Sequence, residues 1–374
     1  MRWLINLIYL SGKELRCVLR DHNMMAAIVV AFSVAIYLVG TGMRADVANV
    51  SVGVIDNDHS GLSMRLREAI RLPQFKDPID VTPEQAQAGM DEGKLIFVIN
   101  IPPHFEADVH ALRSPVLQVS VDATAMTQAR LGTAYLNEIL IRETLEYLKV
   151  QGVDARLPTR AVVHTLFNPN KTSKWFTSIM QVINNITILA VVLVGAAVIR
   201  EREHGTLEHL LVMPVRASEI AMAKILANGL VILVAVGLCM VVVVERVLDV
   251  PVAGSLWLFL AGTAIYLFSL AALGILLATL ASSMPQFGLL AVPVFVIMYL
   301  LSGSTTPRES MPQPLQDLML ASPSTHYVKL AQGVLYRGAD WDIVWPHCAA
   351  MSGIGFVFLI VALLRFRSML ARQG

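Results

Sequence analysis

Six long apolar runs, separated by polar segments, divide this chain. They cover residues 24–43, 175–199, 225–244, 256–281, 287–301 and 343–364. A helix of 20 residues rising about 1.5 Å each extends roughly 30 Å, the thickness of the hydrocarbon layer of a bilayer. The pattern therefore predicts six transmembrane helices. Because the fifth run is short and contains Pro293, we expect its helix not to complete its crossing regularly.

The segment before the first run, residues 1–23, has a different pattern. Over residues 2–20, basic and polar side chains recur at helical spacing on one face and apolar side chains on the other. This predicts a cytosolic amphipathic helix lying in the membrane interface, with its basic side toward the headgroups of membrane lipids. A cleaved signal peptide is an alternative that Gly40 and Gly42 would allow, but no clean small-residue cleavage site is evident.

Residues 44–174 form a long insertion after the first run. They contain 14 Lys/Arg and 16 Asp/Glu, an ordinary balance for a soluble domain. Strand-like and helix-like patterns alternate along them, which predicts a mixed α/β domain. The strands are expected at residues 50–55, 95–101, 116–121 and 161–167, and the helices at 59–71, 82–90 and 126–149.

Asp56, Asp58, His59 and Ser60 follow the first expected strand of the insertion. They allow two interpretations, a metal site or a turn that leads into a helix cap. The second is favoured, because Asp and Ser commonly take these positions in turns and caps, and no other cluster with ligand spacing supports a metal. We therefore expect no bound metal.

Composition excludes several classes of protein. Hydrophobic residues make up 55% of the chain and the mean hydropathy is +0.62, which is too apolar for a soluble globule. The formal net charge of +1 implies no nucleic-acid partner. The insertion contains no cysteine, so it is not a disulfide scaffold. No GxxxxGK[ST] sequence is present, and the insertion has no GxSxG sequence, so we expect no enzyme, no catalytic residues and no cofactor bound by this chain.

Basic residues predict the orientation in the membrane. Lys and Arg concentrate before the first run, in residues 200–224 and after the last run, whereas the short loop after the third run has only Arg246. By the positive-inside rule, both termini, the loop 200–224 and the tail 365–374 are cytoplasmic. The insertion at 44–174 is then external.

The loop 200–224 is the most elaborate of the expected cytoplasmic segments. Thr206 can cap a short helix with Glu208 in its first turn, and Pro214 ends that helix. Ser218 and Glu219 then begin the next helix. Such a compact charged element between two spans is suited to contact a cytosolic protein.

The same loop carries a resemblance to a known family. Residues 201–214 read EREHGTLEHLLVMP, with Lys224 ten residues on, and residues 302–312 read SGSTTPRESMP. These motifs and the order of the spans resemble type 2 ABC transporter permeases. The resemblance implies that the loop docks on a separate ABC ATPase subunit, which holds the ATP and Mg²⁺, and that two permease subunits form one transporter. The residues expected to couple the two proteins are Glu203, Gly205, Thr206, Glu208 and Pro214.

Polar residues inside the second run have two interpretations. Gln181, Asn184 and Asn185 are costly to expose to lipid, so they either form hydrogen bonds between helices or line a transport path or dimer interface. Both can hold, and we assign these three residues to the path.

Prolines punctuate residues 302–342, between the last two runs. Irregular backbone at membrane depth must pack against protein or a wet cavity, so we expect a partly re-entrant external cap. Its candidate residues are Pro307, Glu309, Pro323 and His326. A proton or substrate role for His326 is weighed against a purely structural one, which is commoner for a single histidine beside a span.

Together these features predict a multi-pass permease of the bacterial inner membrane. In resembling permeases, a large first external domain goes with export of drug-like or small amphipathic compounds and with a periplasmic adaptor protein. The alternative is a receptor or docking protein whose external domain binds a ligand, although six spans with intramembrane polar residues exceed what an anchor needs.

Overall fold

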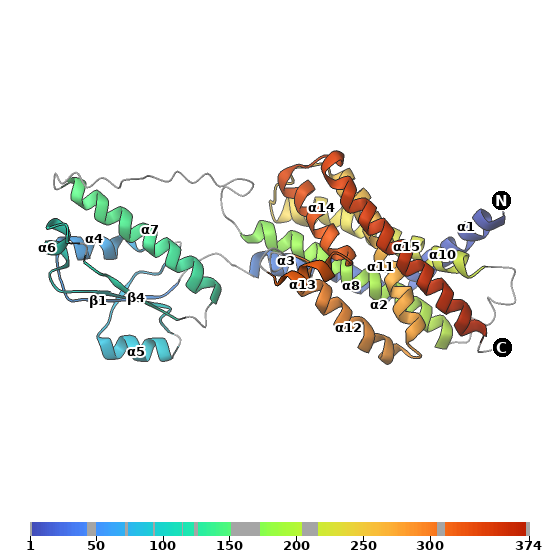
Figure 1. Cartoon of the computed structure of the whole chain (residues 1–374), viewed down its shortest axis with the longest axis horizontal. Helices are drawn as coiled ribbons and strands as arrows, with labels where there is room; N and C mark the ends of the chain where they lie inside the picture. Colours follow the sequence, from blue (N-terminus) through green and yellow to red (C-terminus); the bar gives the residue numbers. More distant parts are fainter. Residues whose placement is uncertain are drawn as a thin grey trace. The chain divides into compact units, whose positions relative to one another are not determined.

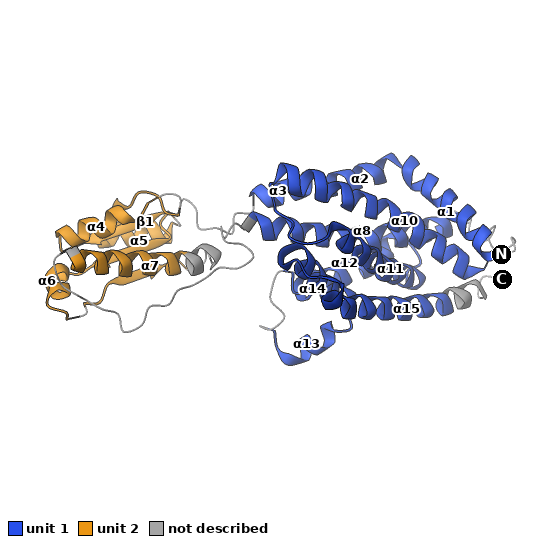
Figure 2. Cartoon of the chain, turned by 90° about the horizontal axis from the view of Figure 1, so that it is seen from above, with its two compact units in different colours: residues 1–43, 174–374 blue, residues 44–173 orange. Residues whose placement is uncertain are grey.

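The computed structural model describes residues 2–42, 50–71, 74–92, 94–113, 115–122, 126–150, 173–203, 216–304 and 311–371. The chain forms two compact units (Figure 2). One consists of residues 1–43 and 174–374 and is helical. The other, residues 44–173, is an α/β unit.

A four-stranded sheet in the order β2-β1-β3-β4 forms the centre of the α/β unit (Figure 1). β1 pairs in parallel with β2 and β3, and β4 pairs antiparallel with β3. The strands are β1 (Val52–Asp56), β2 (Ile79–Asp80), β3 (Phe97–Ile101) and β4 (Gln118–Val121). β1, β3 and β4 confirm three predicted strands. β2 was missed because two exposed residues carry no alternation, and the strand expected at 161–167 lies outside the described residues.

Helices cover both faces of this sheet. α4 (Gly61–Ala69), α6 (Phe105–His110) and α7 (Met126–Val150) pack on one face, where Val52, Val54 and Phe97 are buried. α5 (Pro83–Asp91) packs on the other face against Val98. Thr82 caps α5 as predicted, since its hydroxyl oxygen accepts a hydrogen bond from the Gln85 N–H at 3.3 Å.

The segment after β1 is a turn that leads into helix caps. The Asp56 carboxylate accepts hydrogen bonds from the N–H groups of Asp58 and His59, both at 3.0 Å. The Asp58 carboxylate accepts from the N–H groups of Phe105 and Glu106, also at 3.0 Å, and so caps α6. These contacts agree with the turn-and-cap interpretation. Burial opposes ionisation of Asp56, but the hydrogen bonds outweigh it and lower the pKa of this carboxyl.

The helical unit contains six segments long and apolar enough to cross a membrane, within the described residues. The second and fourth are central, because 78% and 67% of their most apolar windows are buried, against 17–28% for the first, fifth and sixth. This confirms the predicted number of spans. They are α2 (His22–Phe32) with α3 (Val34–Gly42), α8 (Ser173–Glu203), α10 (Ala217–Cys239) with the π-helix η1 (Met240–Val247), α11 (Leu256–Leu280), α12 (Met284–Leu301) and α15 (Trp341–Ala371).

Two spans differ from expectation. The first is interrupted at Ser33, whose hydroxyl donates to the Val29 carbonyl oxygen, although no Gly or Pro marks the break. The expected irregularity of the fifth span is wrong, because α12 begins at Met284 and continues through Pro293 without a break. Transmembrane helices tolerate an internal proline in this way.

Among the described residues, this unit also contains α1, α13 and α14. α1 (Arg2–Arg20) confirms the predicted amphipathic helix and exposes an apolar face that includes Trp3, Leu4 and Ile8. α13 (Gln313–Met319) and α14 (Pro323–Arg337) occupy the expected cap. α14 is buried on most of its sides. Its Tyr327 stacks on Tyr266 of α11 with ring centroids 4.1 Å apart.

Candidate functional site

Charged side chains of three helices and backbone groups of one turn meet at one end of the helical unit, here termed the charged end. It comprises α1, the last turn of α8, the first two turns of α10 and the turn between α11 and α12. In the sequence, the end of α8 and the start of α10 flank residues 204–215. Four predicted coupling residues, Gly205, Thr206, Glu208 and Pro214, lie outside the described residues, whereas Glu203 is described.

A buried ion cluster joins three helices at the charged end. The side chain of Lys224 on α10 is 2% exposed, and its Nζ lies 3.1 Å from Glu14 Oε2 on α1 and 2.9 Å from Glu201 Oε2 on α8. Lys13 Nζ lies 3.8 Å from Glu201 Oε1 at the exposed rim. Two ammonium groups thus balance two carboxylates. Such pairing offsets the desolvation free energy that burying the charges costs.

A second contact docks α10 on α1. Glu219 is almost fully buried, and its Oε2 accepts hydrogen bonds from the Arg216 N–H at 2.8 Å and from Asn6 Nδ2 at 3.5 Å. The first of these closes the capping box of α10, which begins at Ala217 as the Ser218–Glu219 pair predicted. The first turns of α10 are therefore held both by a cap and by α1.

The end of α8 forms two hydrogen bonds with the turn between α11 and α12. Arg202 donates a hydrogen bond to the Ala281 carbonyl oxygen at 2.7 Å, and Glu203 Oε1 accepts one from the Met284 N–H at 2.9 Å. A cation thus meets the carbonyl end of α11, and a carboxylate meets the N–H end of α12, as the two helix dipoles favour. Glu203, predicted as a contact for the ATPase, therefore also holds the start of α12.

An ion pair connects α8 to the residue before the first span. Arg200 NH1 lies 2.9 Å from Asp21 Oδ2, and Asp21 Oδ1 caps α2 by accepting from the Met24 N–H at 3.1 Å. The hydrogen bond from Met24 and then the one from Arg200 lower the pKa of Asp21. The carboxylate is therefore ionised at neutral pH and serves the cap and the ion pair together.

The predicted path residues lie on α8, and two of them form hydrogen bonds within the protein. Gln181 Nε2 donates to Asn185 Oδ1 at 2.8 Å, and Asn185 Nδ2 donates to the Ala31 carbonyl oxygen of α2 at 2.5 Å. Asn184 is nearly buried. The interhelical hydrogen bond, one of the two alternatives, is therefore present at Asn185, beside the break in the first span. A role in a transport path stays a prediction.

In the predicted cap, Pro307 and Glu309 lie outside the described residues. Pro323 begins α14, and His326 Nε2 lies 3.0 Å from the Leu320 carbonyl oxygen. His326 Nδ1 lies 3.4 Å from His347 Nδ1. If Nε2 of His326 donates to the carbonyl, its Nδ1 is the acceptor and His347 is the donor. His326 therefore has a defined structural environment and is not a single isolated histidine.

The ion cluster at Lys224 was not predicted from the sequence. One signal for it exists, since Glu14 is the only acidic residue of α1 and shares a face with Leu7 and Val18 at helical spacing. An acid on the apolar face of a basic helix indicates a buried cation elsewhere in the chain. Nothing in the local sequence identifies that cation as Lys224.

The fold and the charged end define a polytopic helical membrane protein whose spans are tied together at one end, around a short connection between the second and third spans. The sequence profile described as ABC-2 family transporter protein matches residues 24–364. The chain belongs to this family, which confirms the predicted resemblance.

Related proteins have corresponding names. The chain is 46% identical over 98% of both sequences to a protein of Escherichia coli (strain K12) named inner membrane transport permease YhhJ. It is 29% identical to the probable multidrug ABC transporter permease YbhR of that organism, over 90% of this chain and 91% of the relative. It is 24% identical to YbhS, which has the same description, over 88% of each.

Membership of the family makes this chain the membrane subunit of an ABC transporter. It is a multi-pass protein of the inner membrane. The family also implies an ATPase partner and a dimer of permeases.

Proposed function

We propose that this subunit exports small amphipathic, drug-like compounds, driven by a separate ATPase that holds ATP and Mg²⁺ and docks on the loop 200–224. In this proposal the charged end and both termini face the cytoplasm, and the α/β unit lies in the periplasm. The distribution of basic residues supports the orientation. The relatives described as multidrug permeases support the substrate class.

The charged end carries the proposal. Both boundaries of the segment 204–215 are anchored, at Glu201 to Glu203 on one side and at Arg216 to Lys224 on the other, and both reach α1. A displacement of this segment by a partner therefore acts on α1, α8, α10 and α12 together. ATP-dependent closure of the partner shifts the equilibrium between two arrangements of the spans, provided that the partner binds one of them more tightly.

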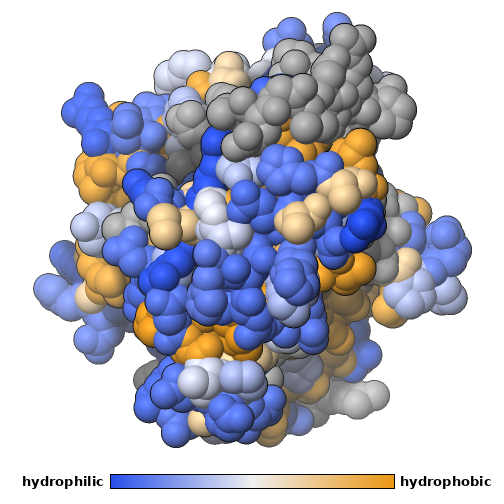
Figure 3. Space-filling model, turned by 90° about the vertical axis from the view of Figure 1, so that its left-hand side faces the viewer, coloured by the Kyte–Doolittle hydropathy of each residue, from blue (hydrophilic) through white to orange (hydrophobic). Residues whose placement is uncertain are grey.

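A periplasmic adaptor is the further partner that we propose for the α/β unit. The face drawn in Figure 3 is mostly hydrophilic, as a domain in water requires. The exposed apolar side chains of Leu112 and Ile141 line a hollow of about 540 Å³ in this unit. Such an apolar hollow on the surface of the unit is suited to bind a second protein.

The test is efflux of a fluorescent amphipathic dye from cells that express this chain with its ATPase. We expect efflux with the wild type and none with an ATPase whose P-loop lysine is replaced. Gly205→Pro should abolish efflux and the stimulation of ATPase activity at normal membrane expression, and Gly205→Ala is the matched control. If Gly205→Pro leaves both activities intact, the coupling assignment is wrong.

Docking is tested separately by co-purification from native membranes. Glu208→Lys should release the ATPase, whereas Glu245→Lys, in η1 at the other end of the third span, should not. If no ATPase co-purifies with the wild type and the α/β unit instead retains a soluble ligand, a receptor function replaces the exporter. The family match argues against that outcome.

A further inference from the structure

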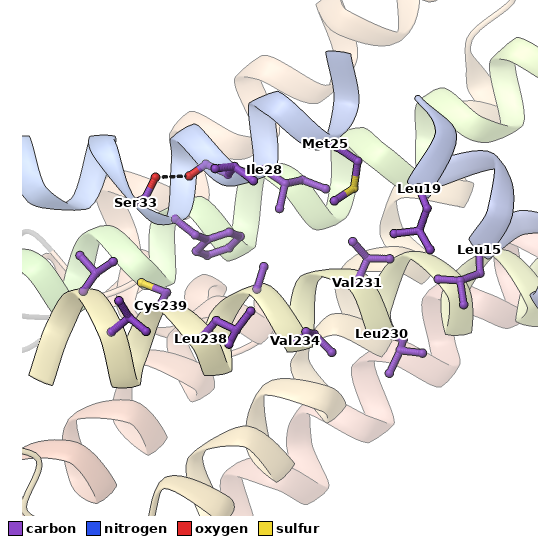
Figure 4. A pocket seen from close by; sticks show the side chains of 15 residues that line it. Leu15, Leu19, Met25, Ile28, Ser33, Leu230, Val231, Val234, Leu238 and Cys239 are labelled. Atoms are coloured by element: carbon purple, nitrogen blue, oxygen red, sulfur yellow. Dashed lines mark hydrogen bonds between the residues drawn. The ribbon is translucent and has the colours of Figure 1, made fainter. Parts of the chain in front are cut away.

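An apolar groove runs between the first and third spans of the helical unit (Figure 4). Leu15 and Leu19 of α1 lie at one end, and Ser33 lies at the other. The side chains of α2 and α10 that face it form two parallel walls, and almost all of them are hydrocarbon. Its volume is about 490 Å³.

The length and lining of the groove suit a hydrocarbon chain. Along α10 and η1 the groove extends from Leu230 to Val243, which is about 20 Å at 1.5 Å per residue. The side chains along it are almost all apolar. The groove therefore offers an extended acyl chain continuous apolar contact.

The depth of the groove matches one leaflet. It begins at the amphipathic helix α1 and ends at Ser33, eleven residues after the start of α2, or about 17 Å along the span. Half of a hydrocarbon layer of roughly 30 Å is about 15 Å. A chain that enters beside α1 would thus end near the bilayer centre, as an acyl chain of a phospholipid does.

The entrance also carries charge. Arg16 and Arg20 directly follow Leu15 and Leu19, and both are exposed. Neither forms an ion pair with a carboxylate of the described residues. Two exposed guanidinium groups at headgroup depth attract phosphate and an anionic headgroup.

We propose that this groove is a binding site for one anionic phospholipid of the leaflet that contains α1, with an acyl chain between α2 and α10 and its headgroup at Arg16 and Arg20. The lipid completes the packing between two spans that otherwise contact each other little along the groove. The site depends neither on the substrate nor on the direction of transport. It also differs from general lipid contact, because it selects a headgroup charge.

The experiment uses the purified full chain in phosphatidylcholine vesicles. A minor component is phosphatidylglycerol with a photoreactive acyl chain, and a parallel sample has the same chain on phosphatidylcholine. After illumination, cross-linked peptides are identified by mass spectrometry. We expect labels on residues 25–33 and 230–243, with the anionic probe favoured by about fivefold for each arginine.

Two variants and their controls test the assignment. Val234→Trp fills the groove and should remove the labels, whereas Val357→Trp on α15 should not. The two valines are similarly exposed, at 53% and 58%. Arg16→Gln with Arg20→Gln should keep the labels but lose the preference for the anionic probe, and Arg246→Gln should keep both. This second comparison also serves if Val234→Trp fails to fold.

Three results would overturn the proposal. The first is labelling spread evenly over the lipid-exposed helices without headgroup preference, which indicates bulk lipid only. The second is the absence of labels from the groove while other exposed faces are labelled, which indicates that protein, such as a second copy of this chain, covers it. The third is unchanged groove labelling in folded Val234→Trp.

Discussion

Removing the central cation of the buried ion cluster should release α1 from the helical unit. In Lys224→Met, the carboxylates of Glu14 and Glu201 lose their shared partner. Because their Oε2 atoms lie 3.1 and 2.9 Å from the same nitrogen, they are at most 6.0 Å apart. At this distance two negative charges repel by about 2.8 kcal/mol at an effective dielectric constant of about 20. Loss of the hydrogen bonds adds to this, so we expect a total cost of about 3–5 kcal/mol.

Hydrogen exchange of the backbone amides of α1, measured in detergent by mass spectrometry, reports this cost. A loss of about 3 kcal/mol in local stability accelerates exchange by roughly 100-fold, because each 1.4 kcal/mol is a factor of ten. Lys13→Met is the matched control. The Lys13 side chain is 52% exposed, and its Nζ lies as far as 3.8 Å from Glu201 Oε1, so its loss should change exchange by less than about fivefold.

A triple variant without charges in the cluster tests whether the charge or the shape of the Lys224 side chain holds α1. Combining Lys224→Met with Glu14→Gln and Glu201→Gln removes the uncompensated charges and should restore most of the protection of α1. If Lys224→Met alone exchanges as slowly as the wild type, the cluster does not hold α1 in place. If the triple variant exchanges as fast as Lys224→Met, the shape of the lysine side chain is what matters, and the electrostatic reasoning fails.

Further predictions concern single contacts. Glu203→Ala should destabilise the start of α12 by about 1 kcal/mol, seen as faster exchange at residues 284–287 only; unchanged exchange there would contradict the capping role. Asp58→Ala should lower the melting temperature of the α/β unit, at a cost of about 1–3 kcal/mol, because two N–H groups of α6 lose their acceptor; Asp58→Asn should cost less. Tyr327→Phe loses only the hydrogen bond with Thr263 and should reduce the free energy of unfolding by no more than about 1.5 kcal/mol. Tyr327→Ala also loses the stack on Tyr266 and should reduce it by about 3–5 kcal/mol, as measured by thermal unfolding. Equal effects of the two variants would refute the importance of the ring stack. Hydrogen bonds hold the pKa values of Asp56 and Glu106 below their ordinary values of 3.8 and 4.5. Their ionised forms therefore stabilise the α/β unit fully above these values, and this contribution is lost as the pH falls further. Acid unfolding of Glu106→Gln, followed by circular dichroism, should be less steep than that of the wild type.

Local patterns in the sequence predicted local structure well. The spacing of charges over residues 2–20 located α1, and Thr82 located the start of α5. The break at Ser33 could not be found in this way, because it depends on a side chain that bonds to its own helix and on Asn185 of another span. The strand β2 is too short to show a period of two.

At the candidate site, too, local features could be predicted from the sequence and contacts between helices could not. The loop between the second and third spans was identifiable from its charges and its motif. Glu203 lies at the charged end, and its contact with the ATPase stays a prediction. The residues that contact Glu203 and Lys224 could not be identified from the sequence, because these contacts depend on which helices pack together. Glu14 and Lys224 are 210 residues apart, and only the folded bundle brings them to 3.1 Å.

That separation also sets an order for the assembly of the protein during its synthesis. At about 5–20 residues per second, a ribosome needs on the order of ten to forty seconds to travel from Glu14 to Lys224. For this whole interval Glu14 exists without the cation that it meets in the folded bundle. The contact between α1 and α10 therefore forms only after the start of the third span has been made.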